Sequence, residues 1–317
     1  MDTGRHYLTG FLQGEPQQRP AFVPLMRGML ARVGGVSLEH LTTDASLWAG
    51  SLQKTTELFD CDAVVAGFDD TLLAEGCGCS VAWEHDRPEM REPPSELCAA
   101  PETQGRLSCA LEAARRVFQV CRNERACVAA MAGPVKLAGQ LFGPERGVER
   151  IKEIKQHLVT ITEAFCRLRP DMLILIEDDP LGEAGITLGH RRIYNTLRNI
   201  ADYYAIPVAV YVQGYSAGDY ERFLKLGVDI YIFGPGSNNT LPDLEELFDV
   251  AKKAHGVGIG LPLDDIDRAR AIISRGCELF RSHGGCRFFL TSHGPVTRDI
   301  EMEALHRIVR DIQEVRL

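Results

Sequence analysis

The stretch 172–212, MLILIEDDPLGEAGITLGHRRIYNTLRNIADYYAIPVAVYV, decides the fold of this chain. It begins and ends with short apolar runs at 172–177 and 207–212, which are rich in β-branched residues and predict buried strands. The residues at 189–203 between them have helical periodicity. A strand, a helix and a second strand in this order form the repeating unit of a parallel α/β sheet.

The same alternation extends outward in both directions from this unit. Six further apolar runs predict strands, at 22–26, 63–68, 126–131, 228–233, 257–260 and 287–290. Further helices are expected at about 44–59, 105–123, 145–168, 217–226, 243–254, 264–275 and 301–314. Eight strands alternating with helices predict a single-domain α/β fold, a (β/α)8 TIM barrel. A doubly wound sheet would alternate in the same way, but no GxGxxG follows the first strand and the even count favours closure.

The predicted barrel occupies residues 20–317, and residues 1–19 precede it as an N-terminal extension. A loop insertion rich in Pro and Glu interrupts the alternation at about 85–104. A segment of this length without regular structure is usually functional or disordered. Two interpretations of the insertion stay open, a mobile cover over the barrel mouth and a surface loop.

Composition limits the classes of partner. The net charge of −9 and the pI near 5.5 argue against nucleic-acid and anionic-membrane partners, because those partners require a basic surface. The first 18 residues lack the apolar core of a secretion signal, and no stretch is long and apolar enough to span a membrane. We therefore expect a cytoplasmic protein whose ten cysteines are reduced.

The sequence gives two weak indications of a metal site. Cys77 and Cys79 form a Cys-x-Cys pair, but no second pair at zinc-like spacing accompanies them, which favours buried free thiols. The acidic run 177–179 is consistent with either a divalent-cation site or a solvated turn. We predict no metal ligands and no cofactor.

Polar residues follow the predicted strands at their carboxyl ends, where the active sites of barrels lie. Because neighbours on an extended segment point in opposite directions, one of Asp69 and Asp70 is expected to face the pocket and the other to cap the next helix. His293 precedes a predicted helix, whose N-terminus would lower the imidazole pKa toward the neutral form. The candidates at the strand ends are Arg27, Arg32, Asp69, Asp70, Gly133, Pro134, Glu177, Asp178, Tyr211, Gln213, Ser292 and His293.

From about residue 20 onward, the chain resembles the uroporphyrinogen decarboxylase superfamily, which includes zinc- and corrinoid-linked methyltransferases. Four motifs support the resemblance, and they occur in the family's order. They are Met26-Arg27-Gly28, Asp69 nine residues before Gly78, Gly133-Pro134 in GPVKLAGQLFG, and His293-Gly294 after the last strand.

The resemblance implies cofactor-free decarboxylation of a carboxylated, tetrapyrrole-like substrate. Arg27 would bind a carboxylate, Asp69 would face the developing cation and His293 would donate the proton. Of the two adjacent aspartates, Asp69 would then face the pocket and Asp70 would cap the next helix. The residues expected to bind substrate are Arg32, Gly133, Pro134, Gln140, Tyr211 and Gln213. The family's second arginine is replaced by Ala31, with Arg32 one place later, and its tyrosine near Gln140 is missing. These departures leave the substrate open.

The methyltransferase branch provides the alternative function. Its members hold zinc with a His-x-Cys at the end of the fifth strand and a Cys after the last one, where this chain has Tyr211-Val212-Gln213 and Ser292 or His293. The alternative is therefore a methyltransferase without this zinc site that works with a corrinoid protein. A third hypothesis is a non-catalytic barrel that binds a tetrapyrrole or a corrinoid. The resemblance also allows a homodimer.

Overall fold

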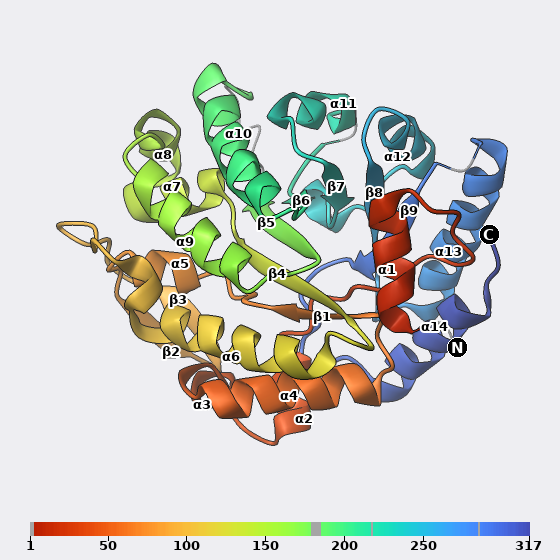
Figure 1. The fold of residues 1–317 in the computed structure, drawn as a ribbon, viewed down its shortest axis with the longest axis horizontal. Coiled ribbons are helices and arrows are strands. Elements are labelled where there is room, and N and C mark those ends of the chain that lie inside the picture. The colour runs from red at the N-terminus through yellow and green to blue at the C-terminus, as the bar shows by residue number, and fades with distance from the viewer. Residues whose placement is uncertain (1–2, 179–184, 217, 285) are drawn as a thin grey trace.

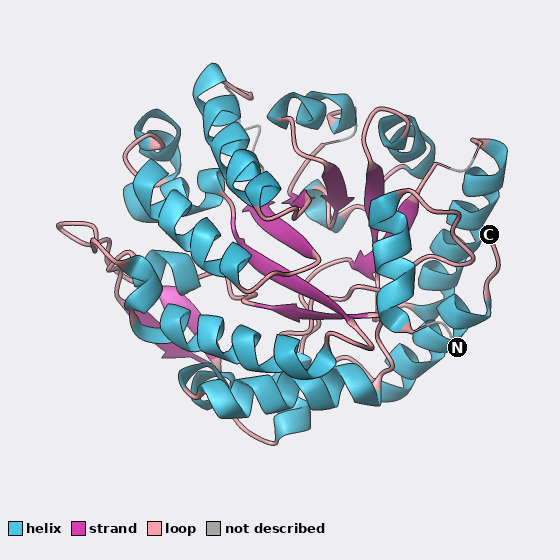
Figure 2. Ribbon diagram, in the orientation of Figure 1, coloured by secondary structure: helices cyan, strands magenta, loops and turns pink. Residues whose placement is uncertain are grey.

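The computed structural model describes residues 3–178, 185–216, 218–284 and 286–317. Its centre is a curled, parallel sheet of seven strands surrounded by helices (Figures 1 and 2). The strands are neighbours in chain order: β1 (Ala63–Ala66), β4 (Ala126–Ala132), β5 (Met172–Asp178), β6 (Val208–Gln213), β7 (Ile230–Phe233), β8 (Gly256–Leu261) and β9 (Phe288–Ser292). Nearly every strand residue is buried, which explains why these strands are continuous apolar runs rather than alternating ones.

The prediction of a regular strand at 22–26 is wrong. Phe22 and Met26 form isolated bridges to Leu290 and Val296, and the Asp62 amide donates to the Phe22 carbonyl at 3.2 Å. The segment therefore contacts both β9 and the start of β1 without becoming a strand. Pro24 explains the interruption, because a proline has no N–H to donate to a ladder. The parallel α/β sheet is as predicted, but in the described residues it has seven strands and not the eight of the predicted barrel.

Helices pack against the outer face of the sheet and follow the strands as predicted. The residues expected to form one helix at 145–168 form two, α8 (Pro144–Arg150) and α9 (Lys155–Arg167). The helix expected at 217–226 is the short α11 (Tyr220–Phe223) followed by a 3-10 helix at Leu224–Leu226, and residue 217 lies outside the described residues. The helices are α2 (Gly28–Gly34), α3 (Leu38–Thr43), α4 (Ala45–Leu58), α5 (Leu72–Gly76), α6 (Gly105–Cys121), α7 (Pro134–Phe142), α8 (Pro144–Arg150), α9 (Lys155–Arg167), α10 (Leu188–Tyr203), α11 (Tyr220–Phe223), α12 (Leu244–Ala251), α13 (Ile266–Ser282) and α14 (Met302–Glu314).

Residues 1–19 contain a helix that packs into the core. Helix α1 (Gly4–Gln13) contacts β1, β4 and β9, and it buries Leu8 and Phe11 among the side chains on the inner face of the sheet. The rings of Phe11 and Phe289 lie 5.1 Å apart, edge to face. The helix thus covers the amino-terminal ends of the strands, and the carboxyl ends are left for a site.

The segment expected to be an irregular insertion is partly regular. Its first residues form the turn of an antiparallel hairpin, β2 (Val81–Glu84) and β3 (Arg87–Met90), in which His85 and Asp86 have positive φ. The Asp86 carboxylate accepts hydrogen bonds from the Leu38 amide at 2.6 Å and from Arg298 at 3.1 Å. The hairpin is therefore attached to α3 and to the loop after β9.

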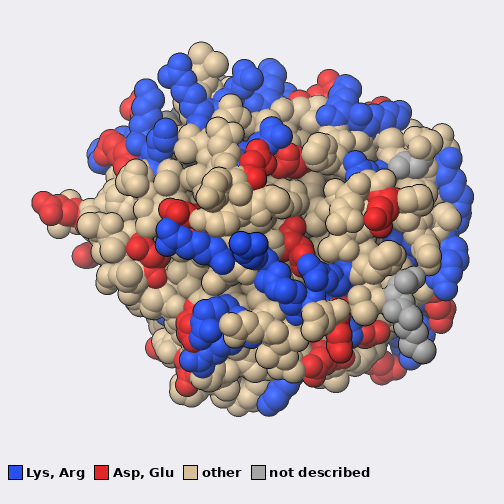
Figure 3. All heavy atoms as spheres, in the orientation of Figure 1, with Lys and Arg blue, Asp and Glu red and all other residues tan. Residues whose placement is uncertain are grey.

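Charged side chains of both signs are spread over the surface. On the face in Figure 3, Lys and Arg side chains lie beside Asp and Glu side chains rather than forming one basic patch. None of the helices in the described residues is long and apolar enough to cross a membrane.

Candidate functional site

Seven charged side chains meet at the carboxyl ends of β1, β4 and β5. They alternate in sign and contact one another in sequence, and we name them the carboxyl-end network: Glu75, Arg106, Asp69, Arg27, Asp70, Lys136 and Asp178. The site positions of a parallel α/β fold lie at this end of the strands.

Asp69 lies in the buried part of the network. Its Oδ2 is 3.0 Å from Arg106 Nη1 and 3.7 Å from Arg27 Nη2, and its Oδ1 accepts two hydrogen bonds of 2.8 Å from Thr71. Burial by itself would raise the pKa of Asp69, but Arg27, Arg106 and Thr71 together hold that pKa below its usual value. Asp69 is therefore a buried carboxylate anion that orders the loop after β1.

Asp70 is the carboxylate at the centre of the network that reaches solvent. Its side chain is 31% exposed, and its two oxygens contact Arg27 Nη1 at 3.1 Å and Lys136 Nζ at 2.6 Å. We had expected the reverse, with Asp69 facing the pocket and Asp70 capping the next helix. The hydrogen bonds from Thr71 explain the difference, because Asp69 takes the local turn contacts that a capping residue would take.

Lys136 is a buried cation between two carboxylates. Its side chain is 6% exposed, and Nζ lies 2.6 Å from Asp70 and 2.8 Å from Asp178. Burial lowers a lysine pKa, but Asp70 and Asp178 outweigh that effect, and the pKa of Lys136 is raised. Gln213, a predicted substrate-binding residue, donates to the same Asp178. Lys136 therefore stays protonated, and its ammonium group lies at the carboxyl ends of the strands.

Glu177, at the end of β5, is fully buried next to the network. It accepts hydrogen bonds from the Val135 and Lys136 amides, at 3.0 and 2.7 Å, and from the Tyr194 hydroxyl. Burial raises the pKa of Glu177 to about 7. The carboxyl group thus caps the N-terminus of α7, the helix that positions Lys136. Asp179 lies outside the described residues, so the alternatives for residues 177–179, a divalent-cation site or a solvated turn, stay predictions.

His293 lines a cavity that adjoins the one beside Arg27 and Asp70. Its Nε2 is 3.2 Å from Asn239 Oδ1, and its carbonyl accepts a 2.8 Å hydrogen bond from the Tyr211 hydroxyl. Burial is the main cause that lowers the pKa of His293, rather than the helix terminus that we expected. The imidazole lines a cavity of about 920 Å³, whereas Arg27 and Asp70 line a neighbouring one of about 570 Å³. The two cavities share Pro295, Thr297 and Asp299 in their linings, so they adjoin at this end of the sheet.

The other predicted site residues have varied positions. Gly133 is the residue before α7, where a Cβ would overlap Glu177, and Pro134 begins that helix. Gln140 donates to the Asp70 carbonyl at 2.8 Å. Arg32 donates instead to the Arg298 and Ile300 carbonyls, at 3.0 and 2.9 Å. Arg32 therefore does not replace the family's second arginine within the network.

The predicted burial of Cys77 and Cys79 is confirmed. Cys77 and Cys79 are buried and unbonded, and burial raises the pKa of their thiols to about 12 and about 11. In the part of the chain that the structure describes, no three His, Cys, Asp or Glu side chains are arranged to hold a metal ion.

Sequence similarity identifies the family. Residues 3–172, more than half of the chain, match the family model described as Uroporphyrinogen decarboxylase (URO-D). The chain belongs to the URO-D family. The resemblance inferred from the four motifs is thereby confirmed. The N-terminal helix α1 lies within the matched region, although we expected the resemblance to begin at about residue 20.

Other proteins of known structure have a fold similar to that of this URO-D family member. A methyltransferase from Methanosarcina mazei is 16% identical, and the match covers 99% of both chains with a TM-score of 0.79. A B12-independent methionine synthase from Shewanella sp. W3-18-1 is 11% identical, with a TM-score of 0.52 over 84% of this chain and 86% of that one. At these identities the likenesses establish the fold. No curated protein sequence matches the chain.

Proposed function

We propose that this URO-D family member is a methyltransferase-type enzyme that acts on a small molecule bound at the carboxyl-end network. A corrinoid protein would be its partner and would supply the cobalt centre that exchanges the methyl group. One observation supports this function over decarboxylation of a polycarboxylate: each cation of the network is already paired with a carboxylate. The fold shared with the Methanosarcina methyltransferase is consistent with it.

The charge balance of the network argues against a polycarboxylate substrate. Four carboxylates surround three cations, and the most exposed members are the acids Asp70 and Asp178. A substrate with several carboxylates would have to displace these ion pairs before an arginine could bind it bidentately. Methyl transfer requires no such cluster of unpaired cations.

Apart from His293, the side chains at the relatives' zinc positions do not fit a zinc ion. The Tyr211 hydroxyl donates to the His293 carbonyl at 2.8 Å, and burial raises its pKa well above the usual value, which keeps the hydroxyl protonated. Gln213 is bound to Asp178, and Ser292 Oγ accepts from the Leu25 amide at 3.0 Å. Zinc ligands in proteins are thiolates, imidazoles and carboxylates. We therefore assign no step to zinc.

In this proposal, Lys136 assists the departure of the group that loses the methyl. As the methyl group passes to the corrinoid, negative charge develops on the oxygen, nitrogen or sulfur atom that loses it, and a positioned N–H donor stabilises that charge. Asp70 and Asp178 keep Lys136 protonated and aimed at this end of the sheet. Asp70, which reaches solvent, would orient the substrate.

A spectroscopic assay tests the proposal. The protein is mixed with chemically reduced cobalamin and, in turn, with methylated amines, methyl ethers and methyl thioethers, and methylcobalamin is followed by its absorbance. We expect one donor class to react, and we expect K136M and D70N to lower the rate by about 100-fold or more. K252M is the matched control, because Lys252 pairs with Asp249 on the exposed face of α12. The proposal would be contradicted if the folded protein formed no methylcobalamin from any of these donors. It would also be contradicted if K136M formed methylcobalamin at the wild-type rate.

Decarboxylation is the second candidate, favoured by the approach of Arg27 to Asp69 at 3.7 Å, the two residues that the resemblance selects. Incubation with uroporphyrinogen under reducing, anaerobic conditions separates the two functions. Products with successively fewer carboxylates, and a much lower turnover in D69N at similar substrate affinity, would favour the decarboxylase.

A further inference from the structure

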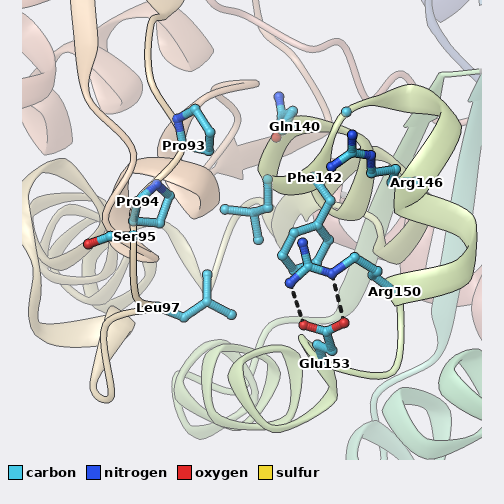
Figure 4. A pocket seen from close by; sticks show the side chains of 11 residues that line it. Pro93, Pro94, Ser95, Leu97, Gln140, Phe142, Arg146, Arg150 and Glu153 are labelled. Atoms are coloured by element: carbon cyan, nitrogen blue, oxygen red, sulfur yellow. Dashed lines mark hydrogen bonds and ion pairs between the residues drawn. The ribbon is translucent and has the colours of Figure 1, made fainter.

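A cavity of about 640 Å³ lies between the insertion and the helix pair α7–α8 (Figure 4). The insertion contributes an apolar wall that includes Pro93, Pro94 and Leu97. Phe142 and two arginines, Arg146 and Arg150, face that wall from the α7–α8 side. The volume lies within the range of small-molecule sites, and the lining combines apolar surface with a few polar groups, as such sites do.

The arginine side of the cavity has an excess of positive charge. Arg150 donates two hydrogen bonds to Glu153, of 2.7 and 2.6 Å, and its guanidinium lies 3.9 Å from the centre of the Phe142 ring. The ion pair and the ring together fix Arg150 in place. Glu153 is the one carboxylate among the lining residues that the structure describes, so Arg146 gives this lining a net charge of +1.

Gln140 provides a separate indication of a ligand. Its Nε2 donates to the Asp70 carbonyl at 2.8 Å, which fixes the orientation of the amide. Its Oε1 is buried and has no hydrogen-bond partner in the described part of the chain, although Gln140 lines the cavity. A buried acceptor without a partner costs free energy, and a ligand N–H or O–H donor would satisfy it once a small movement of the lining opens this atom to the cavity.

We propose that this cavity binds an aromatic carboxylate that also carries an N–H or O–H donor. The carboxylate pairs with Arg146, the ring packs against Leu97, Pro94 and the apolar wall, and the donor reaches Gln140 Oε1. The site gives the insertion a function, since its residues 93–97 form one wall. The inference concerns binding alone and does not depend on the proposed methyl transfer.

Calorimetric titration without any corrinoid tests the site. The probe is indole-3-acetate, which has a ring, an N–H and a carboxylate, and its neutral isostere indole-3-acetamide is the control ligand. We expect saturable binding of one indole-3-acetate per chain and at least tenfold weaker binding of the amide. R146Q and, independently, L97D should each weaken the acid by about tenfold, because one removes the pairing cation and the other adds a like charge.

R222Q is the matched control variant, since Arg222 pairs with Asp219 on α11, outside the lining of this cavity. Circular dichroism of each variant checks the fold. Absence of saturable binding, equal affinity for acid and amide, or unchanged affinity in both R146Q and L97D would overturn the proposal. The titration measures binding and not activity. The binding proposal can therefore fail while methyl transfer is observed, and methyl transfer can fail while binding is observed.

Discussion

Replacement of Arg106 by methionine should strongly destabilise the fold. The Arg106 side chain is 4% exposed, and it contacts Asp69 at 3.0 Å, Glu75 at 2.6 Å and Thr71 at 2.7 Å. Methionine retains much of the volume but leaves the buried Asp69 charge with Arg27 at 3.7 Å as its remaining cation. Removal of one partner from a buried ion pair typically costs about 3–5 kcal/mol, and we expect a loss in this range for R106M.

A double-mutant cycle separates the ion pair from the packing. Urea unfolding followed by circular dichroism gives the free energy of unfolding of the wild type, R106M, D69N and the double variant. We expect the double variant to be more stable than the sum of the two single losses predicts, by about 1–3 kcal/mol. R115M is the matched control, because Arg115 is on the same helix but pairs with Glu112 at the surface, and it should leave the unfolding curve unchanged.

The destabilisation should also depend on pH. Asp69 has a lowered pKa in the folded protein, so its ionisation contributes stability above its unfolded pKa, and that contribution is lost as the pH falls through the folded pKa. R106M lacks part of this contribution, and its difference from the wild type should therefore shrink in acid. A loss below about 1 kcal/mol at neutral pH, or strictly additive single variants, would refute the reasoning.

Three further predictions concern residues of β5, β6 and the start of α7. Burial raises the pKa of Glu177 from 4.5 to about 7, so the unfolded state loses this proton at a lower pH than the folded state does. Between these two pH values, the free energy of unfolding of the wild type relative to that of E177Q should therefore fall by about 3 kcal/mol. Urea midpoints of the two proteins across that range measure this, and parallel curves would contradict it. Gly133→Ala places a Cβ against Glu177 and should cost about 1–3 kcal/mol in thermal unfolding, whereas an unchanged Tm would show that the contact is relieved at no cost. Tyr211→Phe removes the 2.8 Å hydrogen bond to the buried side of the His293 carbonyl and should cost about 1–3 kcal/mol by the same measurement, with wild-type stability as the opposing result.

The sequence by itself determined the class of fold and the positions of the elements. Strands such as β5 (Met172–Asp178) are continuous apolar runs because helices cover one face of the sheet and other strands' side chains cover the inner face. Burial of this kind leaves a local pattern that does not depend on which strand is the neighbour. The strand ends, and thus the list of residues near the site, follow from the same pattern.

The irregular parts of the fold had weaker local signals. Pro24 was visible in the sequence, and a stricter use of its missing N–H would have removed the strand expected at 22–26. The hairpin turn at His85 and Asp86 has positive φ without a glycine, so no turn signal marked it. Its hydrogen bonds to Leu38 and Arg298 connect residues far apart in the chain.

Only the tertiary structure decided which charges meet. Arg106 and Lys136 are 37 and 66 residues from the aspartates that they contact, and both lie on helices where a charged residue usually marks a solvated face. Their role depends on β1 and β4 being neighbours in register, which brings α6 and α7 to the same strand ends. The same neighbour relations put His293 and Arg27 in adjoining cavities at the carboxyl end. Ion pairing depends on distance in space, and a sequence records only distance along the chain.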